Sequence, residues 1–364
     1  MDRQNRNRTN GLVMDRRTVL KGLGASAVGA LAAPLMVRGA AAQSREMVYA
    51  TWGGSWEEAM RKAWFDPFAE RTGIKVRTIS GPDYGKIRAM VRAGRTEWDV
   101  AEVNPDFQWI GPREGLLEKL DFRVIPTDHL IKGENLITEY SVPEAFWSRV
   151  IVYNTKKFSK ENHPTTFVEF WDLKRFPGKR VMYGKPNGGS LEAALLADGV
   201  PADKLYPLDV DRALKSLDKI KDNILWYDTN AQAVQYMQDE QGVLGLVADG
   251  RIKFIQDKGA PVAIEYNQSQ LTWTSYVVPK GAPNKETAMK LIAFMTSLEG
   301  QKAIGTVYTY GLVAPKAYDL LPPERAAMLT NGPQQQGKTI LMNEKWWGEN
   351  LEKTQEKMSA WRIS

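Results

Sequence analysis

Three short turns of one construction carry the residues of this chain that could do chemistry. They are Trp52–Ser55, Asn187–Ser190 and Asp249–Arg251, and in each a strand pattern ends and a helix pattern begins. The first backbone N–H groups of a helix are unpaired and carry partial positive charge, so helix starts favour anions. In open α/β sheets ligands gather outside the carboxyl ends of the strands. The three turns therefore predict one ligand site, if the fold brings them together.

Three tryptophans accompany these turns. Trp52 lies in the first turn, while Trp147 and Trp273 lie in two extended runs, Ser141–Asn154 and Leu271–Pro279. Aromatic rings around a cavity hold an apolar carbon chain or a cationic nitrogen. The alternative is that Trp147 packs inside a hinge, because large aromatic side chains form cores by default.

The residues needed for catalysis are scarce. There is no cysteine, and the two histidines, His129 and His163, have no partner at metal-ligand spacing. No nucleophile elbow or phosphate-binding loop occurs. The sequence thus predicts a binding protein and not an enzyme, with no cofactor and no metal.

The amino terminus explains the basic charge of the chain. Residues 1–42 hold seven basic and two acidic residues, so the overall net charge of +6 leaves only +1 on the rest, which gives no reason to expect a nucleic-acid partner. Arg16 and Arg17 precede a weakly apolar run, Gly22–Val37, and the small residues of Ala40–Ala42. This pattern predicts a twin-arginine signal peptide over 1–42, cleavage after Ala42 and a periplasmic protein. A membrane anchor is the alternative, but the run is short for a span.

Strand and helix patterns alternate along the remainder, in two series. The first series includes strands at Met47–Thr51 and Asp99–Val103, and the second series includes strands at Arg180–Tyr183 and Val243–Val247. Alternation predicts an α/β fold with two lobes, each a mostly parallel sheet flanked by helices. The two extended runs with tryptophans would cross between the lobes as a two-strand hinge. We expect one lobe to comprise 43–147 plus 275–315 and the other 148–274 plus 316–364, with a cleft between them.

Four segments carry a resemblance to a known family. Tyr49–Ser55, Thr72–Val76, Trp98–Val100 and Trp273–Pro279 resemble the periplasmic solute-binding proteins of ABC importers, particularly the branch that binds spermidine and putrescine. The resemblance covers about residues 46–350 and implies a type II-like binding-protein fold. It also implies a monomer that captures a small molecule by lobe closure and delivers it to permease subunits in the inner membrane.

The charged positions favour a ligand other than a bare diamine. By the resemblance, Trp52 and Trp273 match aromatic ligand contacts and Asn104 a polar one, whereas acidic positions of the polyamine binders appear here as Lys185, Gly188 and Thr274. An unpaired ammonium is costly to bury. The mixture of Asp106, Asp249, Lys185 and Arg251 suits a zwitterion or an organic acid, unless Lys185 and Arg251 point to solvent. The predicted ligand-binding residues are Trp52, Gly53, Ser55, Asn104, Asp106, Trp147, Lys185, Gly188, Ser190, Asp249, Arg251, Trp273 and Ser275.

The predicted function is therefore capture of a small organic solute, polyamine-like or a zwitterionic amine, for an ABC transporter. A binding protein for an organic anion or a phosphonate is the main alternative. An exported enzyme is less favoured, because no catalytic or cofactor motif is present.

Overall fold

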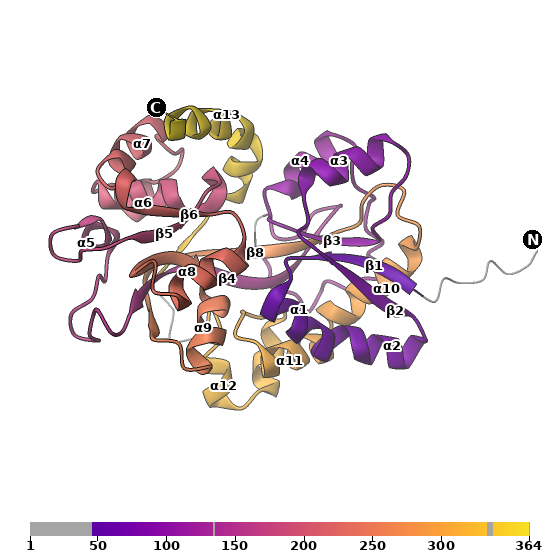
Figure 1. The fold of residues 1–364 in the computed structure, drawn as a ribbon. Helices are drawn as coiled ribbons and strands as arrows, with labels where there is room; N and C mark the ends of the chain where they lie inside the picture. Colours follow the sequence, from indigo (N-terminus) through magenta and orange to yellow (C-terminus); the bar gives the residue numbers. More distant parts are fainter. Residues whose placement is uncertain (1–45, 134, 333–337, 364) are drawn as a thin grey trace, which may run out of the picture. The chain divides into compact units, whose positions relative to one another are not determined.

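A computed structural model describes residues 46–133, 135–332 and 338–363 (Figure 1). The predicted signal peptide, 1–42, lies outside the described residues. Among the residues that the structure describes, no helix is both long enough and apolar enough to cross a membrane.

The described residues form one nine-stranded sheet. The strand order is β2-β1-β3-β8-β4-β7-β5-β6, and β9 pairs with β8. β1, β2 and β3 are mutually parallel, as are β5, β6 and β7, which matches the two mostly parallel series expected from the sequence. The strands are β1 (Glu46–Thr51), β2 (Lys75–Ser80), β3 (Val100–Val103), β4 (Val142–Asn154), β5 (Arg180–Tyr183), β6 (Ile224–Tyr227), β7 (Leu244–Ala248), β8 (Val262–Val277) and β9 (Thr339–Leu341).

Two long antiparallel strands join the two series. β8 pairs with β3 at one end, β4 pairs with β7 at the other, and β4 and β8 pair with each other along their length. Proline is rare inside a central strand, yet Pro143 is the second residue of β4, beside a bulge between Pro143 and Ala145. A bulge interrupts the ladder, so the missing N–H of proline costs little there.

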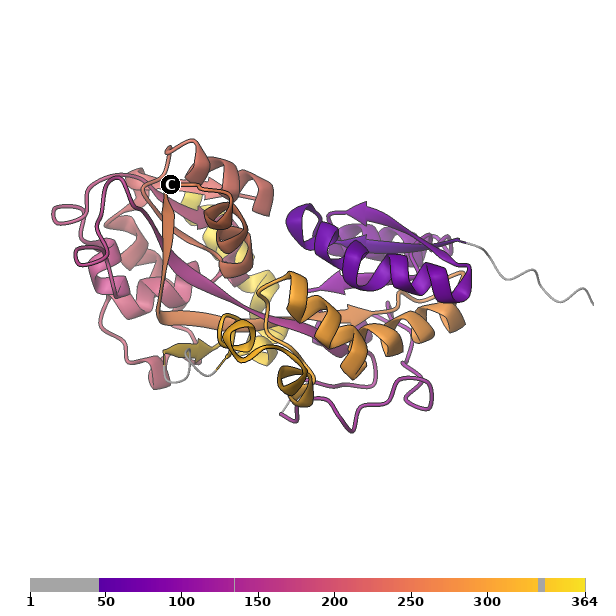
Figure 2. The ribbon, with the colours of Figure 1, turned by 90° about the horizontal axis from the view of Figure 1, so that it is seen from below.

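Helices cover both faces of the sheet in each half (Figures 1 and 2). In the first half, α1, η1, α2, α10 and α11 contribute to one buried apolar cluster, and α3 and α4 to another. In the second half, α5, α6, α7 and α13 share one cluster, and α8 and α9 share the other. The helices are α1 (Gly54–Met60), η1 (Arg61–Phe65), α2 (Asp66–Thr72), α3 (Tyr84–Arg92), α4 (Phe107–Arg113), α5 (Phe167–Trp171), η2 (Pro186–Gly188), α6 (Ser190–Ala197), η3 (Ala202–Lys204), α7 (Val210–Asp218), η4 (Lys221–Asn223), α8 (Asn230–Gln238), α9 (Asp249–Asp257), α10 (Lys285–Thr296), α11 (Leu298–Val307), η5 (Pro315–Leu320), α12 (Pro323–Ala327) and α13 (Glu344–Ile363).

The carboxyl-terminal third of the chain returns to both halves. Ala317, Leu321 and Leu329 pack in the same apolar cluster as Trp56. Trp347 of α13 instead packs in a cluster of the second half. The lobe boundaries remain a proposal, and this packing favours placing 316–332 with the first lobe.

Candidate functional site

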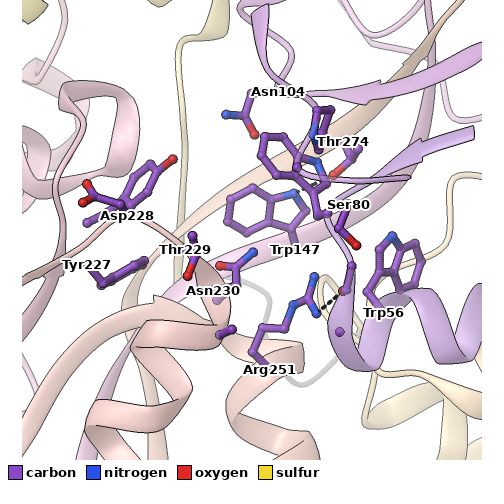
Figure 3. Close-up of a pocket in the computed structure, with 18 of the residues that line it drawn as sticks. Trp56, Ser80, Asn104, Trp147, Tyr227, Asp228, Thr229, Asn230, Arg251 and Thr274 are labelled. Carbon is purple, nitrogen blue, oxygen red and sulfur yellow. Dashed lines mark hydrogen bonds between the residues drawn. The ribbon is translucent and has the colours of Figure 1, made fainter. Parts of the chain in front are cut away.

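A cavity of about 520 Å³ lies at the meeting of the two halves (Figure 3). This volume is in the range of small-molecule sites. Residues from the ends of β1, β2, β5, β6 and β7 face it together with residues of the crossing strands β4 and β8. Its lining residues are Trp52, Gly53, Gly54, Trp56, Ser80, Gly81, Pro82, Asp83, Asn104, Trp147, Arg149, Tyr183, Lys185, Tyr227, Asp228, Thr229, Asn230, Ala231, Ala248, Arg251, Thr274 and Tyr310.

Arg251 is a buried cation in the cavity wall. It lies in the first turn of α9, is 4% exposed, and its Nη1 donates to the backbone oxygen of Gly53 at 2.6 Å. Gly54 allows this approach, since a Cβ there would lie 2.9 Å from Nη1. No carboxylate of the described residues forms an ion pair with Arg251. A buried guanidinium without an anionic partner is costly, so this side chain is suited to an anionic ligand group.

Arg149 lines the same cavity and also interacts electrostatically with buried carboxyl groups. The guanidinium lies 4.6 Å from the centre of the Trp147 ring. Three buried carboxyl groups, Asp106, Glu192 and Glu344, have pKa values raised by burial, and the positive charge of Arg149 lowers each of them. The net effect raises the pKa of Glu344 to about 8. Arg149 therefore serves these carboxyl groups as well as the cavity.

Asp228 supplies a carboxylate at the cavity edge. It follows β6 directly, is exposed, and forms no ion pair with a described residue. In the view of Figure 3, Asp228 lies to the left of the Trp147 ring and Arg251 lies below it. A second acid, Asp83, is already engaged as the N-cap of α3, where it accepts from the Lys86 N–H at 2.8 Å. The cavity thus presents opposite charges together with aromatic surface.

A buried pair of carboxyl groups, Glu102 and Glu144, supports the tryptophan side of the cavity. Glu102 accepts hydrogen bonds from the Trp52 N–H at 2.7 Å and from Trp56 Nε1 at 3.0 Å. Tyr49 donates to Glu144 at 3.0 Å. Burial raises the pKa of both carboxyl groups, and that of Glu144 lies well above its usual range. Glu102 therefore fixes the backbone and side chain that form this wall.

The predicted site residues divide into those that face the cavity and those that do not. Trp52, Gly53, Asn104, Trp147, Lys185 and Arg251 line it. Lys185 is exposed, whereas Arg251 is buried in the wall and does not point to solvent. Seven others lie outside the lining: Ser55, Asp106, Gly188, Ser190, Asp249, Trp273 and Ser275.

Trp273 and Ser275 correct the expected face of the return strand. Successive side chains of a strand point to opposite faces, and Thr274 is the residue of β8 that faces the cavity. Its hydroxyl accepts from Trp147 Nε1 at 3.1 Å. Trp273 is buried and lies 6.4 Å, centre to centre, from the Phe146 ring. A prediction from aromatic type alone selected Trp273, whose side chain lies on the opposite face of the strand from Thr274.

The two predicted acids are also corrected, because both are occupied within the protein. Asp249 accepts from the Gly250 N–H at 2.8 Å, from the Ser148 N–H at 3.3 Å and from the Thr330 hydroxyl. Burial raises the pKa of Asp249 to about 6. Asp106 is fully buried and accepts hydrogen bonds from the Tyr84 hydroxyl and from Asn187 Nδ2. Neither carboxylate is directed at the cavity.

The remaining three residues have local reasons for lying elsewhere. Ser55 Oγ is 3.0 Å from the Tyr308 hydroxyl. A Cβ on Gly188 would lie 2.4 Å from the Tyr183 ring, so this glycine is needed for packing, and Ser190 is fully buried at the start of α6. No residue of the turn Asn187–Ser190 lies in the cavity lining.

Sequence reasoning missed several lining residues. Tyr183, Tyr227 and Asp228 lie at the ends of β5 and β6, and the rule that ligands gather at strand ends would have identified them. Tyr310 and Arg149 carried no such signal, because the first lies in a loop far along the chain and the second inside a long strand.

Three comparisons relate the chain to known proteins. A family model described as bacterial extracellular solute-binding protein matches residues 63–334. The gamma-aminobutyric acid-binding protein of Pseudomonas aeruginosa is 33% identical, over 88% of this chain and 92% of the relative. The spermidine/putrescine-binding periplasmic protein of Salmonella typhimurium is 26% identical, over 75% of this chain and 80% of the relative.

Solved structures give the same relationship. The Atu4243-GABA receptor is 38% identical with a TM-score of 0.78, over 87% of this chain and 97% of that one. AgtB of A. tumefaciens R10 in complex with agropinic acid is 32% identical with a TM-score of 0.81, over 88% and 99%. AttC of the Agrobacterium tumefaciens C58 strain, in an open unliganded conformation, is 31% identical with a TM-score of 0.62, over 87% and 99%. The expected resemblance to solute-binding proteins and their fold is confirmed.

Proposed function

Because this chain belongs to the bacterial extracellular solute-binding protein family, we propose that its ligand is a small zwitterionic amino acid whose amine and carboxylate are separated by a short carbon chain, with GABA as the type. The family binds small organic solutes for ABC importers, and its named relatives are binding proteins. In this proposal the protein is a periplasmic monomer that carries out no catalysis and delivers its solute to a membrane permease.

The single observation that carries the proposal is that a cation, Arg251, and an anion, Asp228, line the same cavity. A guanidinium can hold a carboxylate through two parallel hydrogen bonds. The Asp228 carboxylate can pair with an ammonium group. Trp52 and Trp147 lie along the wall and offer apolar faces to the carbon chain between the charges.

The excess of basic residues disfavours a diamine. Arg149, Lys185 and Arg251 line the cavity against the two acids Asp83 and Asp228. Two ammonium groups would need two free carboxylates, and Asp83 already caps a helix. The same excess favours a second candidate, an organic anion or an acidic conjugate, and one solved neighbour is in complex with agropinic acid.

Titration calorimetry of the mature protein against a panel tests the proposal. We expect GABA to bind more tightly than putrescine or spermidine by at least about tenfold, because each unpaired buried charge costs more than about 1.4 kcal/mol. Agropinic acid reports on the second candidate. Tighter binding of putrescine than of every zwitterion and acid in the panel would contradict the assignment.

Export by the twin-arginine route is part of the proposal. It rests on Arg16, Arg17 and the small residues Ala40–Ala42. Replacing both arginines by lysine should leave uncleaved precursor in the cytoplasm, as seen by fractionation and immunoblotting, whereas Arg6→Lys should be exported normally. Periplasmic accumulation of the double-lysine variant at the normal level would contradict this route.

A further inference from the structure

One hydrogen bond joins the two halves of the protein beside the cavity without taking part in its lining. Asn187 Nδ2 donates to Asp106 Oδ2 at 2.6 Å. Asp106 follows β3 in the first half, and Asn187 lies in η2, after β5, in the second half. Each is two residues from a lining residue, Asn104 and Lys185 respectively, but neither lines the cavity. We propose that this Asp106–Asn187 pair determines ligand affinity by stabilising the closed arrangement of the two halves. The inference rests on the proposed function only in assuming that the halves close on a ligand.

The pair is built asymmetrically. Asp106 is fully buried, and its other oxygen, Oδ1, accepts from the Tyr84 hydroxyl at 2.6 Å, within the first half. The carboxylate is therefore held in place from its own side, and only the bond from Asn187 depends on the second half. Asn187 is half-buried, and the reverse orientation of its amide would set an oxygen against the carboxylate. The bond thus requires the two halves to be together.

A second contact between the halves lies inside the cavity, from Arg251 to the Gly53 oxygen. That contact involves lining residues, so changing it would alter the ligand site itself. Asp106 and Asn187 do not have this complication. The described chain is also more similar in structure to the relative solved with agropinic acid, with a TM-score of 0.81, than to the relative solved open and unliganded, with a TM-score of 0.62. A bond made only in the closed state raises the population of that state and hence the apparent affinity for any ligand that requires closure.

Exchange of the two side chains tests the proposal. Asn187→Asp sets two carboxylates against each other, and we expect it to weaken GABA binding at pH 8 by about tenfold or more, because a charge-assisted hydrogen bond becomes a like-charge contact. The double variant Asp106→Asn with Asn187→Asp restores one donor and one acceptor and leaves an oxygen for Tyr84. It should bind within about threefold of the natural protein, since the same bond forms with its direction reversed. Asn162→Asp, an exposed change of the same charge in the second half, is the matched control.

A ligand-independent measurement separates failure of this inference from failure of the proposed function. The chain has no cysteine, so Ala89→Cys in α3 and Lys215→Cys in α7, both exposed, can carry spin labels. Distance distributions without ligand should show fewer short distances in Asn187→Asp and recovery in the exchanged pair. If GABA does not bind the natural protein, the proposed function fails and these distances still decide the role of the pair. Equal distances and equal affinities in all variants, or an exchanged pair that recovers neither, would overturn the inference.

Discussion

Arg251→Ala should weaken GABA binding by about 30-fold or more, because truncating one partner of a buried charge pair typically costs ~2–5 kcal/mol. Arg251 is 4% exposed, and its guanidinium has no ion pair with a described carboxylate. The ligand carboxylate would therefore be its anionic partner. Titration calorimetry with GABA measures the loss of affinity. The affinity of Arg251→Lys should lie between those of the natural protein and Arg251→Ala, because lysine keeps the charge but cannot form two parallel hydrogen bonds to a carboxylate.

The same variant distinguishes the role of Arg251 from a general loss of fold. Its removal leaves Asp228 in place, so binding of putrescine should fall less than binding of GABA, or rise. Lys290→Ala removes an equal charge from an exposed position and should leave both affinities unchanged. Equal losses for GABA and putrescine would show that Arg251 does not bind the carboxylate of the ligand.

Glu344→Gln should stabilise the protein in alkaline solution. Burial, and then the nearby Asp106 carboxylate, raise the pKa of Glu344 from its ordinary value of 4.5 to about 8. The folded protein therefore binds this proton more tightly than the unfolded chain does, and the stability gained from it is lost as the pH rises from about 4.5 through 8. The difference corresponds to roughly 5 kcal/mol in the free energy of unfolding. The glutamine keeps a neutral acceptor for the Thr272 hydroxyl and removes this dependence.

Urea denaturation at pH 6 and at pH 9 measures this effect. The natural protein should lose unfolding free energy between the two, and Glu344→Gln should lose less, by about 1–3 kcal/mol. Glu349→Gln, an exposed change on the same helix, serves as the control. Parallel pH profiles for the natural protein and Glu344→Gln would show that Glu344 ionises without cost in the folded state.

The sequence by itself determined the class of the fold and the location of the site along the chain. Alternating strand and helix patterns required parallel strands with helices on their faces, because only that arrangement buries both kinds of apolar surface. The glycine turn at Trp52–Gly54 and the turn at Arg251 identified two strand ends that face the cavity. The scarcity of histidine and the lack of cysteine argued for binding without catalysis.

Tertiary structure decided which side chains within those segments face the cavity. A one-residue change of position reverses the face of a strand, so Thr274 lines the cavity and the more conspicuous Trp273 does not. Charge type gave no better guide. Asp249 and Asp228 are both aspartates, but three hydrogen bonds hold Asp249 inside the protein, while Asp228 lies at the cavity edge without an ion pair to any described residue. Two of those partners, Ser148 and Thr330, come from distant parts of the chain. Local patterns carry no information about such contacts, because only the folded chain brings these residues together.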